Sequence, residues 1–457
     1  MKKIIKSFVS LLTISLMICL LSNNVLANSA QTSWHGSDAT GATIIEEDSP
    51  IIVTAEDLTF NIHEFPKNYY DDLVSFQAYD ASVSAKYTFE NPANYDVKAR
   101  MFFPFGTLPL YAYDRFKSSY MLKDHFDNYL IKVNDKVINR QIRYSFMPDN
   151  NDFKLERDIA YLSDQYLDDD FYHPDLKVKE ISFKVEGVDF EKHPAADAYL
   201  KFNADSHKTK LILERQTAFS SSDKMLGTFA NQDNFRLYIL GEDLDNYDWH
   251  LYHDGKRDEE IDAQVSIVQS QEYRFEDFLM KELQDDYSIN KIDWYNAIVT
   301  MFKYYENDGV ILNDGQLNLI YNLMAWYEYE LDIKAHETIT NEVIAPIYPS
   351  IDYSYEPTIY SYRYLLSPAK TYKDFKHLNI YINTDYELID SSIKDFKKEG
   401  ESYHYFSEEL PEEELEFTLS TDINPKQESS VNIFTYILII IALLLVLFTG
   451  IIVRKRK

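Results

Sequence analysis

Cysteine is almost absent from this sequence, since Cys19 is the only one in 457 residues. Cys19 lies in a leader segment that we expect to be removed, so the mature chain would contain none. Disulfide bridges, a thiolate metal site and a cysteine nucleophile are therefore excluded. Stability must come from buried apolar area, and the chain is long enough for two or three domains, each with its own core.

Glycine is also scarce, and the common catalytic motifs are absent from the sequence. The 11 glycines and 14 prolines argue against a disordered stalk or a low-complexity linker, and no internal repeat is found. No glycine-rich phosphate loop or Gly-x-Ser-x-Gly elbow is present, and His63-Glu64 and His336-Glu337 lack the second histidine of a zinc helix. We therefore predict no catalytic residue, cofactor or metal. A pair of carboxylates acting on a glycoside stays open, because 75 acidic residues leave many possible pairs.

Positive charge is in short supply. Lysine and arginine number 45 against 75 acidic residues, for a net charge of −30. Three lysines of the leader and four basic residues of the tail lie outside residues 28–432, which leaves that segment at −37. Such a surface repels nucleic acid, so we expect no nucleic-acid partner. Solubility outside the cell explains the acidity better than an acidic recognition surface does.

Long apolar runs occur only at the two ends. Residues 433–453 are uncharged and would cross a membrane as one helix, and the basic residues 454–457 would stay in the cytoplasm. A buried helix of a soluble protein is the alternative. The sequence thus predicts a single-pass protein of the cell membrane with an extracellular N-terminal ectodomain.

The N-terminal run is typical of a signal peptide. Lys2, Lys3 and Lys6 precede an apolar stretch over residues 8–21, and small residues lead to a cleavage site after Ala27. A retained N-terminal anchor is the alternative. A lipoprotein is not expected, since Ile18 stands where a small residue must precede the lipidated cysteine.

Between these ends, alternating apolar and polar residues predict strands. Residues 83–89 and 97–103 alternate on either side of Asn91-Pro92, which predicts an antiparallel hairpin. Residues 129–133 and 137–144 predict a second hairpin about Asn134-Asp135. Further strands are expected over residues 51–62, 177–188, 199–202, 210–213, 235–240, 262–268, 339–347, 360–366, 378–383 and 415–420.

Helical spacing interrupts the strands. It predicts a short helix over residues 155–166 and helices over residues 275–283, 292–305 and 317–331. The last two, joined through Asn307-Asp308-Gly309, would form an αα-hairpin.

We therefore expect a mainly β fold with α insertions, a β-sandwich-type extracellular region carrying the αα-hairpin, and one C-terminal transmembrane helix. The predicted organisation is a signal peptide (1–27), an N-terminal β-sandwich-like domain (28–150), a second β-rich region with a short helix (151–270), a helical hairpin insertion (271–335), a C-terminal β region (336–424), a spacer (425–432), the transmembrane helix (433–453) and a cytoplasmic tail (454–457).

Four aromatic residues are candidates for ligand binding. Tyr360, Tyr362 and Tyr364 would project from one strand face, where their rings could stack on sugars or cover a sheet core. Trp249 is the fourth. The neighbouring His250 and His253 do not predict a metal site, because on a strand they would point to opposite faces.

The order of a strand ending in Tyr87-Thr88-Phe89-Glu90-Asn91, a second ending in Phe103-Pro104-Phe105 and a hairpin at residues 133–137 resembles the first part of the vault-protein/inter-alpha-trypsin-inhibitor β-sandwich domain. The same layout, with residues 362–368 and 375–382, resembles uncharacterised bacterial exported, membrane-anchored surface proteins. Asn424-Pro425 begins like a sortase signal, but Gln427 stands where cleavage requires threonine. This departure at Gln427 implies that the protein stays in the membrane and is not attached to peptidoglycan.

Together these features favour a non-enzymatic, single-pass surface protein of a Gram-positive-type bacterium, whose ectodomain binds a protein or a glycan. Two alternatives stay open. The chain could be an envelope enzyme acting on polysaccharide through paired carboxylates, or a structural component of an envelope complex.

Overall fold

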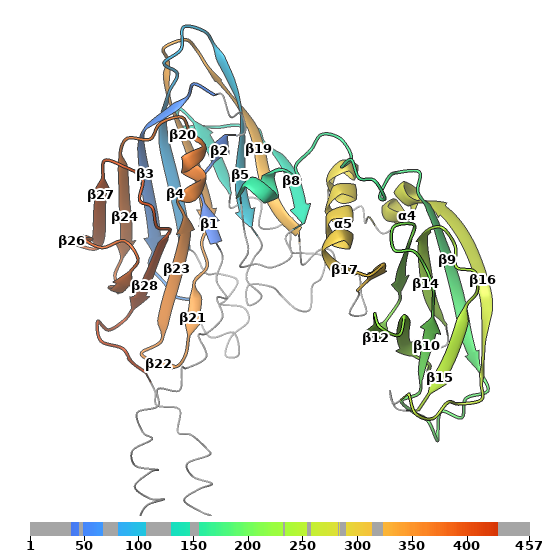
Figure 1. Cartoon of the computed structure of the whole chain (residues 1–457). Coiled ribbons are helices and arrows are strands. Elements are labelled where there is room, and N and C mark those ends of the chain that lie inside the picture. The colour runs from blue at the N-terminus through green and yellow to red at the C-terminus, as the bar shows by residue number, and fades with distance from the viewer. Residues whose placement is uncertain are drawn as a thin grey trace, which may run out of the picture.

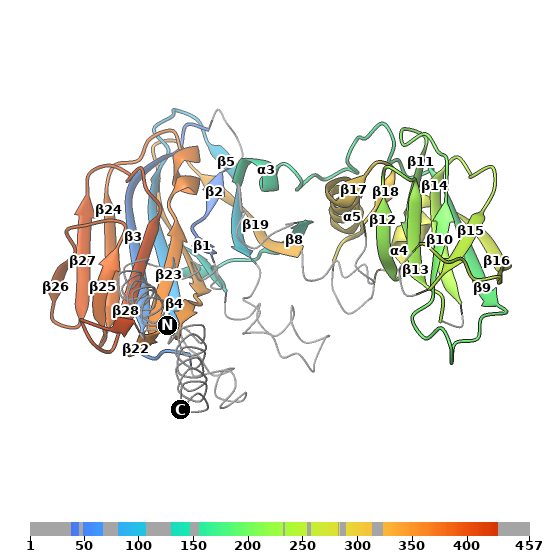
Figure 2. The ribbon, with the colours of Figure 1, turned by 60° about the horizontal axis from the view of Figure 1, so that its bottom comes forward.

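The computed structural model describes residues 38–44, 49–66, 81–106, 129–146, 155–231, 234–253, 257–281, 283, 289–312 and 323–427. These residues form two β-sandwiches with helix α5 (Lys291–Tyr305) between them (Figures 1 and 2). The predicted mainly β fold is confirmed.

The first sandwich contains both ends of the described chain. An eight-stranded sheet, in the order β26-β27-β24-β3-β4-β20-β6-β7, packs against two smaller sheets, β1-β23-β28-β25 with β21 beside β23, and β2-β5-β19-β8. Its strands, with the separate pair β22 and β29, are β1 (Asp38–Thr40), β2 (Thr43–Ile44), β3 (Ile52–Ile62), β4 (Ala81–Glu90), β5 (Val97–Gly106), β6 (Leu130–Val133), β7 (Lys136–Val137), β8 (Gln141–Phe146), β19 (Leu323–Ile333), β20 (Thr338–Pro346), β21 (Ser350–Asp352), β22 (Tyr355–Glu356), β23 (Ile359–Leu365), β24 (Leu378–Thr384), β25 (Glu387–Ser391), β26 (Lys397–Glu399), β27 (Ser402–Ser407), β28 (Leu415–Ser420) and β29 (Lys426–Gln427).

The second sandwich is made from the middle of the chain. A six-stranded sheet, β16-β9-β14-β11-β18-β17, packs against a four-stranded sheet, β12-β13-β10-β15. Its strands are β9 (Lys177–Glu186), β10 (Asp197–Lys201), β11 (Thr209–Leu213), β12 (Gln216–Ser220), β13 (Met225–Phe229), β14 (Phe235–Gly241), β15 (Asp248–Tyr252), β16 (Gln264–Arg274), β17 (Glu306–Asn307) and β18 (Val310–Ile311).

Helices α4 (Phe275–Lys281) and α5 cover the other face of the six-stranded sheet. Asn290 caps α5 by accepting a hydrogen bond from the Asp293 amide at 2.8 Å. Buried side chains of α5 also pack against Tyr144, Phe146 and Leu323 from the first sandwich. One helix therefore contributes to a core that both sandwiches share. Two short helices, α3 (Leu155–Ile159) and the 3-10 helix η6 (Ser367–Thr371), complete the described elements.

The predicted hairpin of residues 83–89 and 97–103 is wrong in its pairing. β4 and β5 are both strands, but β4 pairs with β3 and β20, and β5 pairs with β2 and β19. The chain crosses from one sheet to the other after Asn91, whose side-chain amide donates to the carbonyls of Tyr95, Ile333 and Lys334 at 2.8, 3.1 and 3.1 Å. The predicted alternation of apolar and polar residues along both strands is confirmed, because each strand turns its apolar face to the common core.

The second predicted hairpin is confirmed only near its turn. β6 and β7 pair about Asn134 and Asp135, which both have positive φ (48° and 63°). β8 then leaves for the sheet that contains β19. The continuation of this segment therefore also crosses between sheets.

The predicted αα-hairpin of residues 292–305 and 317–331 is wrong in its second helix. α5 is a helix, but Leu323–Ile333 form strand β19. Glu328, Glu330 and Asp332 alternate with core residues as a strand requires. Trp326 and Met324 point to the opposite face, where Phe102 and Leu162 bury them. Apolar residues on both faces at the start of β19 produced a spacing that resembles a helix.

Sheet pairing links the predicted N-terminal and C-terminal β regions, since β3 and β4 lie between β24 and β20 in one sheet. The predicted signal cleavage at Ala27 and the predicted membrane helix of residues 433–453 lie outside the described residues. Within the described part, no helix is both long and apolar enough to span a bilayer.

Candidate functional site

The predicted tyrosine stripe belongs to the core of the first sandwich. Tyr362 and Tyr364 are buried, and the Tyr362 ring stacks on Phe417 with centroids 5.3 Å apart. Tyr360 is half-buried and stacks on Phe65 at 3.8 Å. Of the two roles that the sequence left open for these rings, the structure agrees with covering a sheet core.

Trp249 is half-buried and packs against the core of the second sandwich. Its ring makes edge contacts with Phe183 and Phe235, with centroids 5.1 and 5.0 Å apart. Alternation along β15 therefore turns the neighbouring His250 and Tyr252 to the opposite, outer face. The sequence reasoning singled out Trp249, on the core side of this strand, and not the residues on its outer side.

Three strands build this outer face of the four-stranded sheet. Antiparallel register aligns the residues in rows, with Tyr199 of β10 between Gly227 of β13 and His250 of β15. We name this surface the aromatic face and define it as Asp197, Tyr199, Lys201, Met225, Gly227, Phe229, Asp248, His250 and Tyr252, with Arg257 lying over it. Their strand neighbours Ala198, Leu200, Leu226 and Leu251 point into the core.

Gly227 fixes the position of the central ring. A Cβ atom at this position would lie 2.6 Å from Cε1 of Tyr199, closer than side-chain atoms approach one another. The Tyr199 ring therefore lies directly against the Gly227 backbone. Tyr252 makes an edge contact with the same ring, with centroids 5.7 Å apart.

His250 is held by carboxylates on both ring nitrogens. Nδ1 lies 2.8 Å from Glu260 Oε1, and Nε2 lies 3.3 Å from Asp248 Oδ2. Burial alone would lower the pKa of His250, but these two hydrogen bonds outweigh it and raise the pKa. The ring stacks beside Tyr252 with an interplanar angle of 20°.

Arg257 supplies the positive charge of the aromatic face. Its guanidinium lies 5.6 Å from the centroid of the Tyr199 ring and pairs with Asp223 at 3.1 Å. The Phe229 side chain is 49% exposed at the end of β13. Of the three rings, Phe229 is exposed, Tyr252 is half-buried and Tyr199 is buried beneath its neighbours, with carboxylate acceptors and a guanidinium donor beside them. This combination suits stacking and hydrogen bonding to a polar ring.

A second charged cluster joins the two sandwiches. Arg143 of β8 donates to both carboxylate oxygens of Asp293 of α5, from Nε to Oδ1 at 3.1 Å and Oδ2 at 3.0 Å, and from Nη2 to Oδ1 at 2.9 Å. Its Nη1 also pairs with Glu328 at 2.6 Å and with Asp164 at 3.1 Å. Burial alone would lower the pKa of Arg143, but the bonds to Asp293 and Glu328 raise it.

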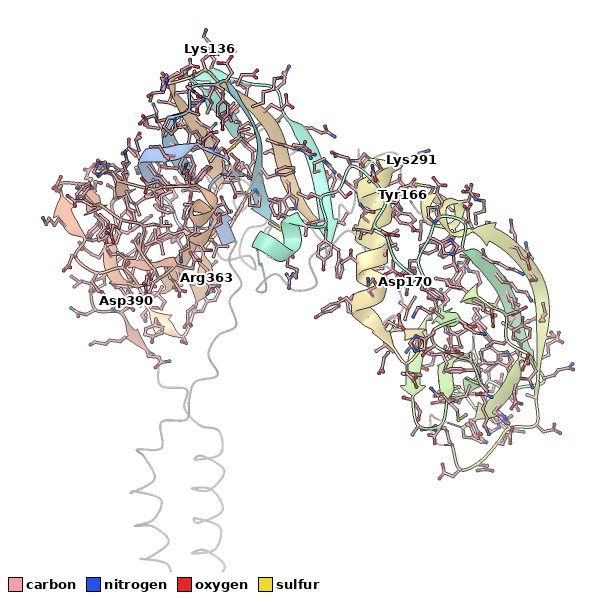
Figure 3. All side chains as sticks on the ribbon, turned by 45° about the horizontal axis from the view of Figure 1, so that its top comes forward. Lys136, Tyr166, Asp170, Lys291, Arg363 and Asp390 are labelled. Atoms are coloured by element: carbon pink, nitrogen blue, oxygen red, sulfur yellow. The ribbon has the colours of Figure 1, made fainter. Side chains whose placement is uncertain are left out.

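This cluster lies at the first turn of α5, where Figure 3 labels Lys291 at the start of the helix and Tyr166 beside it. The Tyr166 ring contacts Tyr295 of α5, with centroids 4.3 Å apart. Arg143 and Asp293 are buried and already paired. The cluster is therefore a structural junction and offers no free group to a ligand.

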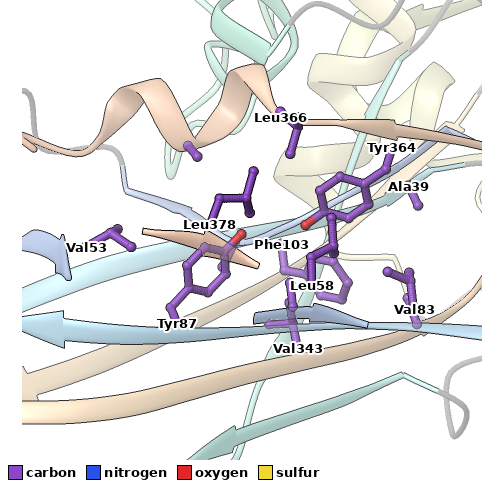
Figure 4. Close-up of a cluster of buried hydrophobic side chains, with 14 of the residues drawn as sticks. Ala39, Val53, Leu58, Val83, Tyr87, Phe103, Val343, Tyr364, Leu366 and Leu378 are labelled. Carbon is purple, nitrogen blue, oxygen red and sulfur yellow. The ribbon is translucent and has the colours of Figure 1, made fainter. Parts of the chain in front are cut away.

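Glu56 is a third unusual group, buried between the sheets of the first sandwich. Tyr364 donates to its Oε1 at 3.5 Å, and burial raises the pKa of Glu56 to about 8. Figure 4 shows Tyr87 and Tyr364 in the same core, among aliphatic side chains. Because apolar residues enclose this carboxyl group, it does not form a site for a substrate.

Among the described residues, no group of three or more His, Asp or Glu side chains is placed to hold a metal ion. The aromatic face is thus the best-supported candidate for ligand binding.

Comparisons with known proteins give no assignment. No family model matches the sequence, and no curated protein matches it. Among solved structures, the chain is similar to a crystal structure of a protein from Legionella pneumophila subsp. pneumophila that is provisionally described as nutrient-binding. The two share 11% identity, over 84% of this chain and 71% of that chain, with a TM-score of 0.34. A similarity at this score supports no conclusion about function.

Proposed function

We propose that this protein is a non-enzymatic binding protein of the bacterial cell surface and that it holds a glycan on the aromatic face. The main support for the proposal is the register of β13, β10 and β15, which brings Phe229 and Tyr252 to one outer sheet surface on either side of Asp197, beside the buried ring of Tyr199. Sugar rings present apolar C–H faces that stack on aromatic rings, and their hydroxyls bind carboxylates and guanidinium groups.

The polar residues fit this ligand class. Asp248 and Glu260 stand beside the rings as acceptors, and Arg257 stands over Tyr199 as a donor. The chain carries a net charge of −30, so a neutral or basic glycan would approach it more readily than an acidic one.

The location at the cell surface is part of the proposal. It is supported by the uncharged residues 433–453 with the basic residues 454–457 after them, and by the leader that ends at Ala27. The resemblance to exported surface proteins and to the vault-protein/inter-alpha-trypsin-inhibitor domain remains a prediction.

Glycan binding is tested with the purified full chain on immobilised cell-wall polysaccharides and host glycans. Tyr252→Ala and Phe229→Ala each remove one ring, and we expect binding about two- to tenfold weaker for each. Phe406→Ala is the matched control, because Phe406 is 52% exposed on β27 of the other sandwich. Unchanged binding in both aromatic-face variants would refute the assignment of the site.

The same experiment separates the alternatives. Release of sugar fragments would favour the envelope enzyme. Absence of glycan binding, together with a stoichiometric protein partner in crosslinked cells, would favour the structural component.

A further inference from the structure

His250 lies between two carboxylates on the aromatic face. Its Nδ1 is 2.8 Å from Oε1 of Glu260, and its Nε2 is 3.3 Å from Oδ2 of Asp248. An ionised carboxylate only accepts hydrogen bonds, whereas a neutral imidazole has one donor nitrogen and one acceptor nitrogen. Both contacts are therefore hydrogen bonds only when both ring nitrogens carry a proton. The geometry of the three side chains thus specifies a positively charged His250.

Glu260 belongs to a short segment, residues 257–262, that runs back along β15. We name it the return segment. The amide of Ile261 in this segment donates to a carbonyl of β15 at 2.8 Å, and Glu260 forms an isolated β-bridge with the same strand. The return segment also carries Arg257, the guanidinium donor of the aromatic face. The bond from His250 to Glu260 therefore ties the segment that supplies Arg257 to the sheet.

We propose that His250 is a positioning residue whose charged form holds the return segment on the aromatic face, so that ligand binding there depends on pH. This regulation rests on the proposed function, a glycan site on the aromatic face. In the charged form, Glu260 and Asp248 each give one oxygen to the imidazole. The second oxygen of each carboxylate is then held in a fixed position, where it can accept a ligand hydroxyl. A neutral His250 donates to one carboxylate only, so the other one loses its fixed position.

The charged form belongs to the lower pH range. Burial lowers the pKa of His250 from its ordinary value of 6.5, but the bonds to Glu260 and Asp248 outweigh burial and raise it. The attachment is therefore complete below pH 6.5 and is lost as the pH rises through the raised pKa. Burial also raises the pKa values of Tyr199 and Tyr252, so neither ring loses its proton near neutral pH. The charged and titratable groups that face His250 are Asp248 and Tyr252 on β15, Asp197, Tyr199 and Lys201 on β10, and Arg257, Glu260 and Asp262 in the return segment.

Two substitutions of His250 separate the effect of its charge from a merely structural role. Binding of neutral chitin oligosaccharides to the purified full chain is measured at about pH 6 and about pH 8.5, because a ligand without ionisable groups adds no pH dependence of its own. We expect the natural protein to bind about two- to fivefold more weakly at the higher pH. His250→Arg keeps a charged donor at both pH values, so its binding should stay strong at both. His250→Gln should bind weakly at both.

His404→Gln is the matched control. His404 lies on β27 of the other sandwich, and its Nε2 is 3.4 Å from the amide oxygen of Asn379. This variant should keep the pH dependence of the natural protein. The same pH dependence in the natural protein, His250→Arg and His250→Gln would overturn the proposal.

Hydrogen exchange tests the role of His250 without a ligand. The Ile261 amide is compared between the natural full chain and His250→Arg at the same pH, so that intrinsic exchange rates cancel. The two should exchange equally at about pH 6, and the natural chain should exchange about two- to fivefold faster at about pH 8.5. If no glycan binds but this difference is found, the proposed function is rejected and the role of His250 is supported. Equal exchange at both pH values would overturn that role whether or not a glycan binds.

Discussion

Glu56 shows how one buried residue can make stability depend on pH. Its ordinary pKa of 4.5 rises to about 8 because the folded protein removes the carboxyl group from water. A group whose pKa is raised by folding binds its proton more tightly in the folded state. Its stabilising contribution is complete below pH 4.5 and is lost as the pH rises through about 8.

We therefore expect Glu56→Gln to remove a pH-dependent contribution that the natural protein carries. Between pH 5 and pH 8, the free energy of unfolding should fall by up to about 1.4 kcal/mol per pH unit more in the natural protein than in the variant. Urea unfolding at several pH values measures this difference, in which the contributions of all other groups cancel. Identical pH slopes for the two proteins would show that Glu56 ionises normally.

At the same scale, sequence alternation identified the right strands for the aromatic residues but not their environment. Tyr362 and Tyr364 do share a face, and that face turns inward because a second sheet with Phe417 covers it. Trp249 and Tyr252 occupy opposite faces of one short strand. Which face is covered depends on a distant sheet, so the local pattern cannot decide it.

At the scale of elements, Asn91 stabilises the crossing between two sheets. It is fully buried, and its side chain donates to the carbonyls of Tyr95, Ile333 and Lys334 and accepts from the amide of Ala93 at 3.0 Å. These bonds tie the β4–β5 connection to the β19–β20 connection. An alanine at this position would leave the buried carbonyls with fewer donors.

Asn91→Ala should reduce the free energy of unfolding by about 1–3 kcal/mol. Asn91→Asp should be at least as destabilising, because a carboxylate would lie beside three carbonyl oxygens. Chemical denaturation measures both, with Asn379→Ala on β24 as the control, because its half-buried side chain bonds only to other side chains, Asp57 at 2.8 Å and His404 at 3.4 Å, and to no buried carbonyl. A loss no larger than that of the control would show that Asn91 does not hold the crossing.

The same connection explains why strand existence was predictable and strand pairing was not. Residues 83–89 and 97–103 carry clear alternation, and Asn91-Pro92 is typical of a turn. The structure uses that turn to change sheets, because β20 and β19, more than 200 residues later, supply the pairing partners. A partner so distant in sequence leaves no local signal.

At the scale of the whole molecule, the sequence placed helix 292–305 correctly but not its role. α5 lies between the two sandwiches, where it packs on Tyr238 and Leu240 of one and on Tyr144 and Phe146 of the other. Nothing in the spacing of its apolar residues distinguishes a helix with one buried face from a helix buried by two bodies. The one sign of contact with the first sandwich is Asp293, a charged residue of α5 that is fully buried and bonded to Arg143 of β8.

Asp293 therefore tests whether the sandwiches are held together by this junction. Asp293→Ala leaves Arg143 buried without its main partner, and it removes the acceptor for the Tyr144 amide at 3.0 Å. We expect a loss of about 3–5 kcal/mol in the free energy of unfolding. Lys394→Ala, which breaks an exposed pair with Asp390, should cost less than about 1 kcal/mol.

The number of unfolding transitions tests the coupling of the two sandwiches more directly than the loss of stability does. If α5 couples the two sandwiches through Arg143, calorimetry of the natural protein should show one transition, and Asp293→Ala should separate it into two. Replacing both partners, by Arg143→Met with Asp293→Leu, should restore part of the lost stability, because Glu328 and Asp164 keep their pairs with Arg100 and no unpaired charge remains. The Tyr144 amide and the Asn290 side-chain amide would lose their acceptor. A single unchanged transition in Asp293→Ala would show that the apolar contacts of α5 suffice to hold the sandwiches together and that the ion pair adds little.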